Sequence, residues 1–484
     1  MKEKILLSIY FLGLFLFLLF VNLYFLEGIP HVPDDTAYLF MSRMFASGHI
    51  ILPIPYSPEH FNFFPGILSV EQGYWLFQYP FGHPILLSFG SLFGFPNIIP
   101  PLVATLSVLL MIKIYSLIYK TKNILFLLPL PLISPFFISN SASFMSHTTA
   151  AFYLLLATYS FILYVFKKRV IYCLITGLSM GLLFNTRPLT SMLFILFFGI
   201  YFLHSSFRKK SYKSIFLYFY GLFIFFLAWT SYNSITSGHI ITSQYYNVNH
   251  GFLDITKPLS EEINSRITNT AILFKNLTPS LFNWPITITY IFIFLPFLFK
   301  KQRKLDLLFL CFILFIPVSY FFYNGTFIMY GPRFWYETTP FIFLLTARGF
   351  QILYNQHKRL TIMLFLGLCV FSILKLSNII KTYSPDIMTP LNLQSLKTFN
   401  FVDARIPNLV KKNHLQNAII FVDPCGYNWW CYGSVFSQNS PNLNTDIIYA
   451  KNLGMQKNTK LISKFPKKHV YIIDYYTLIL QKIR

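Results

Sequence analysis

Long apolar runs constrain this chain more than any other feature of its sequence. Runs of about 20 apolar residues recur along it, beginning at 5–26. A stretch of that length crosses a bilayer as a helix, because lipid offers the backbone no hydrogen-bond partner. Charged residues make up only 11% of the 484 positions, whereas an average soluble protein has about 25%. The sequence therefore predicts an all-α polytopic membrane bundle.

Short basic segments between these runs indicate which ends of the spans share a face. Lys and Arg concentrate in cytoplasmic loops, and this explains the formal net charge of +23 without nucleic acid as a partner. The basic clusters are Lys2 and Lys4, Lys120 and Lys122, 167–169, 208–213, 300–304, and Lys358 and Arg359. About eleven spans fit this pattern: 5–26, 97–119, 123–139, 147–166, 170–186, 188–204, 214–232, 284–299, 305–323, 335–355 and 360–380. The prolines in 123–139 predict that this span is irregular.

Three long segments then lie on the opposite, outer face: 27–96, about 233–283, and the tail 381–484. An odd number of spans places the tail there. In the tail, "AIIFVD" (418–423) and "HVYIID" (469–474) are typical of short buried strands between polar turns. We expect 1–380 to form a transmembrane domain with helices in its outer loops, and 381–484 to form a small α/β domain.

The five cysteines fall into two groups. Cys173, Cys311 and Cys369 lie in predicted spans, where a packing role is expected. Cys425 and Cys431 lie in the outer tail and can pair in an oxidising compartment. The sequence leaves a disulfide and two free thiols equally open.

Two adjacent carboxylates, Asp34 and Asp35, follow a proline a few residues after the first span. One interpretation is structural: carboxylates cap the start of a helix that lies on the membrane through Tyr38, Met41 and Phe45. The other is chemical: Asp34 acts as a general base toward an acceptor hydroxyl. In this interpretation Asp35 tunes the pKa of Asp34, binds substrate, or holds a divalent cation together with Asp34.

Two further segments carry histidines at helix starts. In "YPFGHP" (79–84), Tyr79 and His83 enclose a rigid turn before a helix, where an anion can bind. Aromatic anchoring at the headgroup region and a purely structural histidine are the alternatives. His147 lies at the outer end of another predicted span.

Two arginines lie at span ends on the same predicted face as the Asp pair. Arg187 is part of "NTRP", and Arg333 is part of "YGPRFWYE", between Tyr330 and Glu337. A guanidinium holds a phosphate through two parallel hydrogen bonds, and snorkelling to the interface is the structural alternative. The sequence contains no P-loop, dinucleotide fingerprint or HExxH motif, so we expect an activated donor carried by the membrane rather than a nucleotide sugar.

These segments together resemble the GT-C superfamily of integral-membrane glycosyltransferases. The branch in question holds the protein O-mannosyltransferases and the aminoarabinose transferase that modifies lipid A. The motifs that carry the likeness are "DDTAYL" (34–39), "YPFGHP" (79–84), "LSMGLLFNTRPLT" (178–190) and "MYGPRFW" (329–335). They occur in the family's order, and the likeness covers about residues 1–350.

The resemblance implies a polyprenyl-phosphate sugar donor, an acceptor hydroxyl or amine, and inversion at the anomeric carbon. It assigns the base to Asp34 and a second position to Asp35, where Glu is commoner in the family. Several members carry a basic residue where this chain has Gln78 and Tyr79. The resemblance therefore shifts the expected donor-phosphate contacts to Arg187, Arg333 and His83.

We expect a glycosyltransferase at the outer face of a bacterial inner membrane, acting on a glycolipid, a glycan or a protein. The candidate substrate contacts are Asp35, Tyr79, His83, His147, Arg187, Tyr330, Arg333 and Glu337. A transporter or flippase of a lipid-linked saccharide and a structural membrane subunit are the alternatives. Transporters place charged residues near the bilayer midplane, whereas here the informative charges gather at one face.

Overall fold

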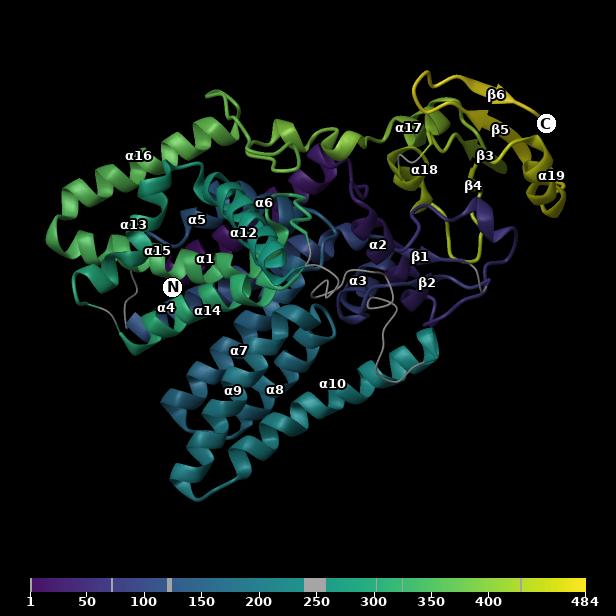
Figure 1. Ribbon diagram of the computed structural model, residues 1–484. Coiled ribbons are helices and arrows are strands. Elements are labelled where there is room, and N and C mark those ends of the chain that lie inside the picture. The colour runs from purple at the N-terminus through teal and green to yellow at the C-terminus, as the bar shows by residue number, and fades with distance from the viewer. Residues whose placement is uncertain are drawn as a thin grey trace.

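The structure is a computed structural model that describes residues 2–70, 73–119, 124–238, 258–301, 303–323, 325–426 and 429–484. Within these ranges the chain forms a helical bundle, with a small mixed sheet at one end (Figure 1). Of the predicted basic clusters, Lys120 and Lys122 lie outside the described residues, as does most of the centre of the predicted loop 233–283.

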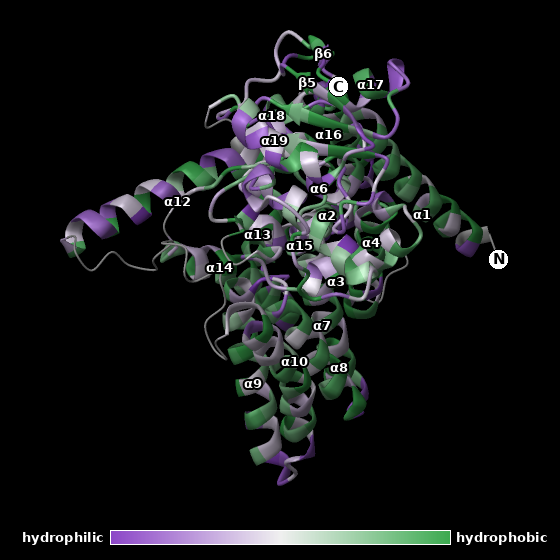
Figure 2. Cartoon of the chain, turned by 90° about the vertical axis from the view of Figure 1, so that its right-hand side faces the viewer, coloured by the Kyte–Doolittle hydropathy of each residue, from purple (hydrophilic) through white to green (hydrophobic). Residues whose placement is uncertain are grey.

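Seven helices in the described part of the chain are long and apolar enough to cross a membrane. These stretches are Lys4–Phe25, Pro96–Tyr119, His147–Lys167, Pro188–Lys209, Lys213–Ser237, Lys304–Phe321 and Lys358–Leu376. They belong to α1 (Lys2–Phe20), α4 (Ile99–Tyr119), α7 (His147–Lys167), α9 (Pro188–Lys209), α10 (Lys213–Ser237), α14 (Lys304–Phe321) and α16 (Lys358–Leu376). The protein is a multi-pass integral membrane protein, and hydrophobic residues dominate α7–α10 (Figure 2).

Three further predicted spans form helices outside that set, and two of the three are shorter. They are α8 (Ile171–Phe184), α13 (Ile286–Leu298) and α15 (Thr339–Gln356). Most of α15 is buried within the protein, and a 3₁₀ turn, Arg333–Thr338, precedes it. The polar helix α12 (Leu259–Phe282) comes from the predicted second outer loop and projects from the bundle (Figure 2).

The predicted span 123–139 is divided into α5 (Pro129–Ile133) and α6 (Pro135–Ala142). Ser134 between them has an extended backbone, with φ −93° and ψ 107°. A residue that precedes a proline is driven out of the helical region by the proline ring. The Ser134 hydroxyl accepts a hydrogen bond from the backbone N–H of Phe137 at 3.3 Å, which caps α6. The expected irregularity is thus a capped break.

The first outer loop contains α2 (Pro33–Ala46), a two-stranded antiparallel ribbon of β1 (Leu68–Ser69) and β2 (Leu76–Phe77), and α3 (Gly82–Leu92). Tyr38 and Met41 of α2 are buried in protein. The expectation that these residues form a stripe on the membrane is therefore wrong, because other parts of the protein cover this side of α2.

The tail forms a four-stranded sheet in the order β4-β3-β5-β6. Its elements are α17 (Arg405–Lys412), β3 (Ala418–Val422), α18 (Trp429–Phe436), β4 (Ile447–Lys451), α19 (Met455–Lys464), β5 (His469–Ile473) and β6 (Leu480–Lys482). The predicted strands at 418–423 and 469–474 are β3 and β5. β3 pairs in parallel with both β4 and β5, and α18 and α19 make the crossovers that parallel strands require.

The tail and the first outer loop share one hydrophobic core. The Phe436 ring of α18 stacks on Phe40 of α2 and on Phe63, with ring centroids 4.7 Å apart in both pairs. The indole N–H of Trp75 donates to the carbonyl of Pro441 at 2.9 Å. A disulfide joins Cys425, which lies just before α18, to Cys431 in the first turn of that helix. The tail therefore supports the loop that carries Asp34.

Candidate active site

A cavity of about 330 Å³ lies where the first outer loop meets the ends of several membrane helices. Its walls come from the start of α2, the segment after β2, the turn between α8 and α9, the end of α14 and the segment 327–334. The lining includes Asp34, Tyr38, Gln78, Tyr79, Thr186, Arg187, Tyr320, Arg333 and Phe334. Motifs far apart in the sequence thus form one site.

Asp34 lies in the first turn of α2, directly after Pro33 at the first helical position. One carboxylate oxygen accepts a hydrogen bond from the Tyr79 hydroxyl, and the other forms an ion pair with Arg333. The helix has Val32 at its N-cap and no side-chain cap. The expectation that Asp34 or Asp35 caps the helix is therefore wrong: Asp34 is instead held by two donors from distant segments.

Asp35 faces the protein interior instead of the cavity. It is 1% exposed, and its Oδ2 accepts a hydrogen bond from the Tyr330 hydroxyl at 3.1 Å. Burial and the adjacent charge of Asp34 raise the pKa of Asp35 well above its ordinary value. Asp35 is thus a buried partner of Tyr330, and neither residue lines the cavity.

The two carboxylates do not fit a divalent cation site. Asp34 is occupied by Arg333 and Tyr79, and Asp35 binds Tyr330. In the described part of the chain, no three His, Cys, Asp or Glu residues gather as metal ligands. A hard cation such as Mg²⁺ or Ca²⁺ needs several oxygen ligands around it, and this arrangement does not supply them.

Arg333 reaches the cavity from the 3₁₀ turn before α15. Burial alone would lower its pKa, but the Asp34 carboxylate outweighs burial, so the pKa of Arg333 is raised. Its Nε is buried and has no hydrogen-bond partner among the described residues. The Arg333 guanidinium also lies 5.2 Å from the ring centroid of Phe334, which holds it over an aromatic face.

Arg187 approaches from the turn between α8 and α9. Its Nη2 donates to the Tyr320 hydroxyl at 2.8 Å and its Nη1 to Ser146 Oγ at 3.3 Å. The guanidinium lies 5.3 Å from the ring centroid of Phe334. The Phe334 ring thus lies close to both guanidinium groups, and both arginines reach one cavity.

A buried acidic group lies behind Arg187. Glu337 Oε1 is 3.4 Å from Arg187 Nε and 3.2 Å from His147 Nδ1. Burial raises the pKa of Glu337 to about 7, although the charge of Arg187 opposes this rise. Neither Glu337 nor His147 lines the cavity. Both were candidates for substrate contact, and the structure places Glu337 against Arg187 and His147 against Glu337.

His83 does not reach the cavity. Its Nδ1 is 2.8 Å from Thr149 Oγ1 and its Nε2 is 2.7 Å from the carbonyl oxygen of Phe144. Burial lowers the pKa of His83 to about 4, so its ring is neutral. The expected contact with a donor phosphate is therefore wrong, because both ring nitrogens are occupied by protein. His83 packs edge-on against Tyr38 at 5.0 Å, and Tyr38 lies 4.6 Å from Tyr79.

Gly82 brings two of the sequence motifs into contact. Its N–H donates to the carbonyl of Asn185 at 2.8 Å. A Cβ at this position would lie 2.6 Å from that oxygen and 2.5 Å from Thr186 Oγ1, so only glycine permits this approach. The "YPFGHP" segment therefore packs directly against "NTRP", and Tyr79 and Arg187 line the same cavity.

Tyr38, Tyr320, Phe334 and Gln78 also line the cavity, and sequence reasoning gave them no site role. Tyr38 follows Asp34 by four residues, so one helical turn places both on the same face of α2. This four-residue spacing is the sequence signal that could have predicted Tyr38 as a cavity residue. Tyr320 lies at the end of an apolar span, and nothing in its sequence neighbourhood marks it.

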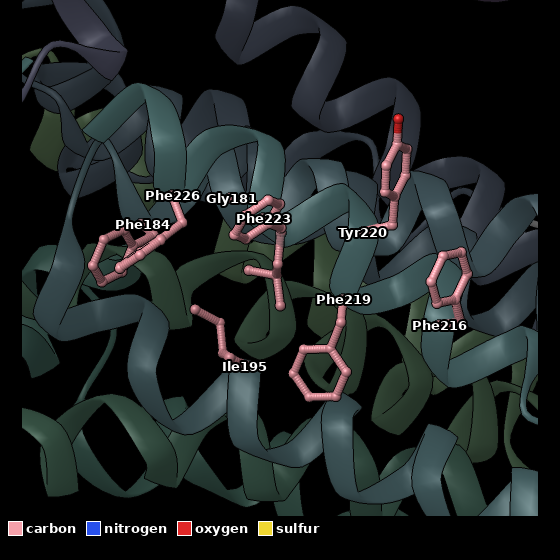
Figure 3. A pocket seen from close by; sticks show the side chains of 9 residues that line it. Gly181, Phe184, Ile195, Phe216, Phe219, Tyr220, Phe223 and Phe226 are labelled. Atoms are coloured by element: carbon pink, nitrogen blue, oxygen red, sulfur yellow. The ribbon is translucent and has the colours of Figure 1, made fainter. Parts of the chain in front are cut away.

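A second cavity, of about 540 Å³, lies between α8, α9 and α10. Figure 3 shows its lining, which is almost entirely apolar and includes Phe184, Ile195 and Phe219. It offers no titratable group except the Tyr220 hydroxyl among the residues that line it. The cavity at Asp34, in contrast, is lined by a carboxylate and two guanidinium groups.

Two crystal structures of ArnT from Cupriavidus metallidurans match this chain. The structure bound to undecaprenyl phosphate has 13% identity and a TM-score of 0.58, over 96% of this chain and 93% of that chain. The apo structure has 11% identity and a TM-score of 0.60, over 96% and 92%. An oligosaccharyltransferase from Archaeoglobus fulgidus matches with 12% identity and a TM-score of 0.45, over 95% of this chain and 69% of that one.

No protein-family model and no curated protein sequence matches the chain. At such low identity the structural matches establish the fold, and they do so over nearly the whole length. The fold expected from the four sequence motifs is confirmed: this chain has the fold of the two ArnT structures.

Proposed function

We propose that the protein transfers a sugar from a polyprenyl-phosphate donor to an acceptor hydroxyl at the outer face of a bacterial inner membrane. The observation that carries the proposal is the lining of one cavity by Asp34, Tyr79, Arg187 and Arg333. This set combines a base with two phosphate ligands. The ArnT structure with the same fold was solved with undecaprenyl phosphate bound, which supports a lipid phosphate as the donor's carrier.

The ion pair between Asp34 and Arg333 gives the site a way to respond to its donor. A donor phosphate placed between Arg187 and Arg333 competes with Asp34 for the Arg333 guanidinium, and Arg333 Nε is available to it. Asp34 then keeps its hydrogen bond from Tyr79 and has one oxygen free. Donor binding thereby prepares the base.

The transfer step follows from these positions. Asp34 accepts the proton of the acceptor hydroxyl while that oxygen attacks the anomeric carbon. The bond between the anomeric carbon and the phosphate oxygen breaks, and its electron pair leaves with the polyprenyl phosphate. Arg187 and Arg333 stabilise the charge that develops on the departing phosphate. Attack from the side opposite to the leaving group inverts the anomeric centre.

We expect Asp34→Asn to lower transfer by a factor of at least about 100, because the amide cannot accept the proton. Membranes holding the variant would be supplied with an undecaprenyl-phosphate sugar, and envelope glycolipids, glycans and proteins analysed by mass spectrometry. Asp474→Asn is the matched control, because Asp474 lies in the tail and forms only local contacts with Thr477 and Tyr476. Normal transfer by Asp34→Asn would refute the assignment, and lipid movement without transfer by the unmodified protein would favour a flippase.

A further inference from the structure

The cavity has few charges, and those charges already have partners. Among the residues that line it, only Asp34, Arg187 and Arg333 are charged. Asp34 pairs with Arg333, and Arg187 pairs with Glu337 behind the wall. A phosphodiester brings one negative charge to the two arginines. The cavity therefore holds one lipid phosphate and has no second free carboxylate for a cation.

Gln78 offers an unused neutral group in the same wall. It follows β2, and its backbone N–H is fixed by the carbonyl of Ile67 at 3.1 Å. The residue is 9% exposed and lines the cavity. Its Oε1 is buried and has no hydrogen-bond partner among the residues that the structure describes. A buried polar atom without a partner is unfavourable, and a ligand hydroxyl would supply the missing donor.

A sugar that carries an amine would be less favourable in this cavity than a neutral sugar. A protonated amine taken out of water needs a negatively charged partner, because desolvating an unpaired charge is costly. The one carboxylate in the lining is engaged by Arg333 and Tyr79. Asp35 is bonded to Tyr330 and does not line the cavity. The Gln78 amide can accept a hydrogen bond from an ammonium group, but it brings no charge to balance it.

We propose that the transferred sugar is neutral and that one of its hydroxyls donates a hydrogen bond to Gln78 Oε1. This inference rests on the proposed function and narrows its donor to polyprenyl-phosphate sugars without a free amine. Gln78 is then a specificity-determining residue in the cavity wall.

The test compares three lipids with the full-length protein in nanodiscs, below the pKa of the sugar amine. The first two lipids are undecaprenyl-phosphate glucose and undecaprenyl-phosphate glucosamine, which carries an amine in place of one glucose hydroxyl. The third is undecaprenyl phosphate, which lacks the sugar. We expect glucose to bind about tenfold tighter than glucosamine. Equal binding of the two sugars, or tighter binding of glucosamine, would overturn the inference while leaving the polyprenyl-phosphate donor in place. Failure of all three lipids to bind would overturn the proposed function itself.

Two variants at position 78 locate the effect. Gln78→Ala is expected to weaken the glucose lipid about fivefold and to leave undecaprenyl phosphate unchanged, because one neutral hydrogen bond is lost. Gln78→Glu is expected to reverse the preference toward glucosamine. Gln416→Glu, on the exposed surface of the tail, adds the same charge far from the cavity and is expected to leave the preference unchanged. Retention of the glucose preference by Gln78→Glu would contradict the role of Gln78.

Discussion

Asp34 and Asp35 are consecutive residues with separate surroundings. Successive side chains on a helix point about 100° apart, so α2 presents one carboxylate to the cavity and the other to the interior. Asp34 contacts Arg333 and Tyr79. Asp35 instead accepts hydrogen bonds from the Tyr330 hydroxyl and the His31 backbone, and burial raises its pKa. One carboxylate can therefore face a substrate while its neighbour anchors the segment before Arg333 through Tyr330.

The buried Glu337 predicts a dependence of stability on pH. Its folded-state pKa of about 7 lies above the ordinary value of 4.5. The folded state therefore binds the proton more tightly than the unfolded state. The stabilisation from protonation is complete below pH 4.5 and is lost as pH rises through 7. We expect Glu337→Gln to flatten the fall in unfolding free energy between pH 5 and 8, an effect of up to about 3 kcal/mol.

Melting temperatures of the purified protein at several pH values in this range test the prediction. Glu59→Gln is the matched control, because Glu59 is half exposed, and this variant should keep the slope of the unmodified protein. A neutral amide at position 337 also cannot pair ionically with Arg187, so transfer should fall. An unchanged pH slope in Glu337→Gln would show that another group titrates there.

At the scale of single elements, α2 lies between the cavity and the tail. Its first turn carries Asp34, and further along the ring of Phe40 stacks on Phe436 of α18. Arg43 donates to the carbonyls of Ser437 and Asn439, which extends the contact. The position of the base is therefore set partly by a helix that follows it by about 400 residues.

Phe436→Ala should accordingly affect both stability and transfer. Removing a fully buried ring costs about 3 kcal/mol or more, and α2 loses the surface that fixes its tilt. We expect a lower melting temperature and, well below that temperature, a reduced transfer rate. Phe401→Ala removes a ring that is 57% exposed in the same tail and should change the unfolding free energy by less than about 0.5 kcal/mol. Full activity of Phe436→Ala would show that the tail does not position α2.

Elements were predictable where their signal is local. Strands β3 and β5 and most spans follow from runs of apolar residues, and the break at Ser134 follows from Pro135. Short sequence motifs also predicted three of the residues that line the cavity, namely Asp34, Arg187 and Arg333. Three-dimensional packing decided the rest: His83 has both nitrogens occupied by Thr149 and Phe144, and such occupancy leaves no trace in the sequence.

At the scale of the whole molecule, the basic segments and the cavity should lie on opposite faces of the membrane. Positive segments such as 167–169 and 208–213 follow the ends of α7 and α9 that lie away from Arg187. Cytoplasmic loops hold such residues, so we expect the cavity and the tail on the outer face.

Cysteine labelling tests this orientation in intact bacterial cells. In a Cys311→Ser background, we expect a membrane-impermeant maleimide to label Met455→Cys, at an exposed position in α19, and to spare Lys358→Cys, at the start of α16. Permeabilised cells should label both variants, which shows that both thiols react. The reverse pattern in intact cells would place Asp34 in the cytosol and end the proposed reaction.

The shared core of the first outer loop and the tail has a consequence for biosynthesis. Trp75 bonds to Pro441, and Lys451 donates to the carbonyl of Asn62 at 2.5 Å. The ribosome makes the loop several hundred residues before the tail, so the nascent chain enters the bilayer with its reaction centre still unsupported. Translation that stops anywhere before the tail should therefore yield an inert membrane protein, and the proposed glycosyl transfer should begin only once residues 381–484 have been delivered.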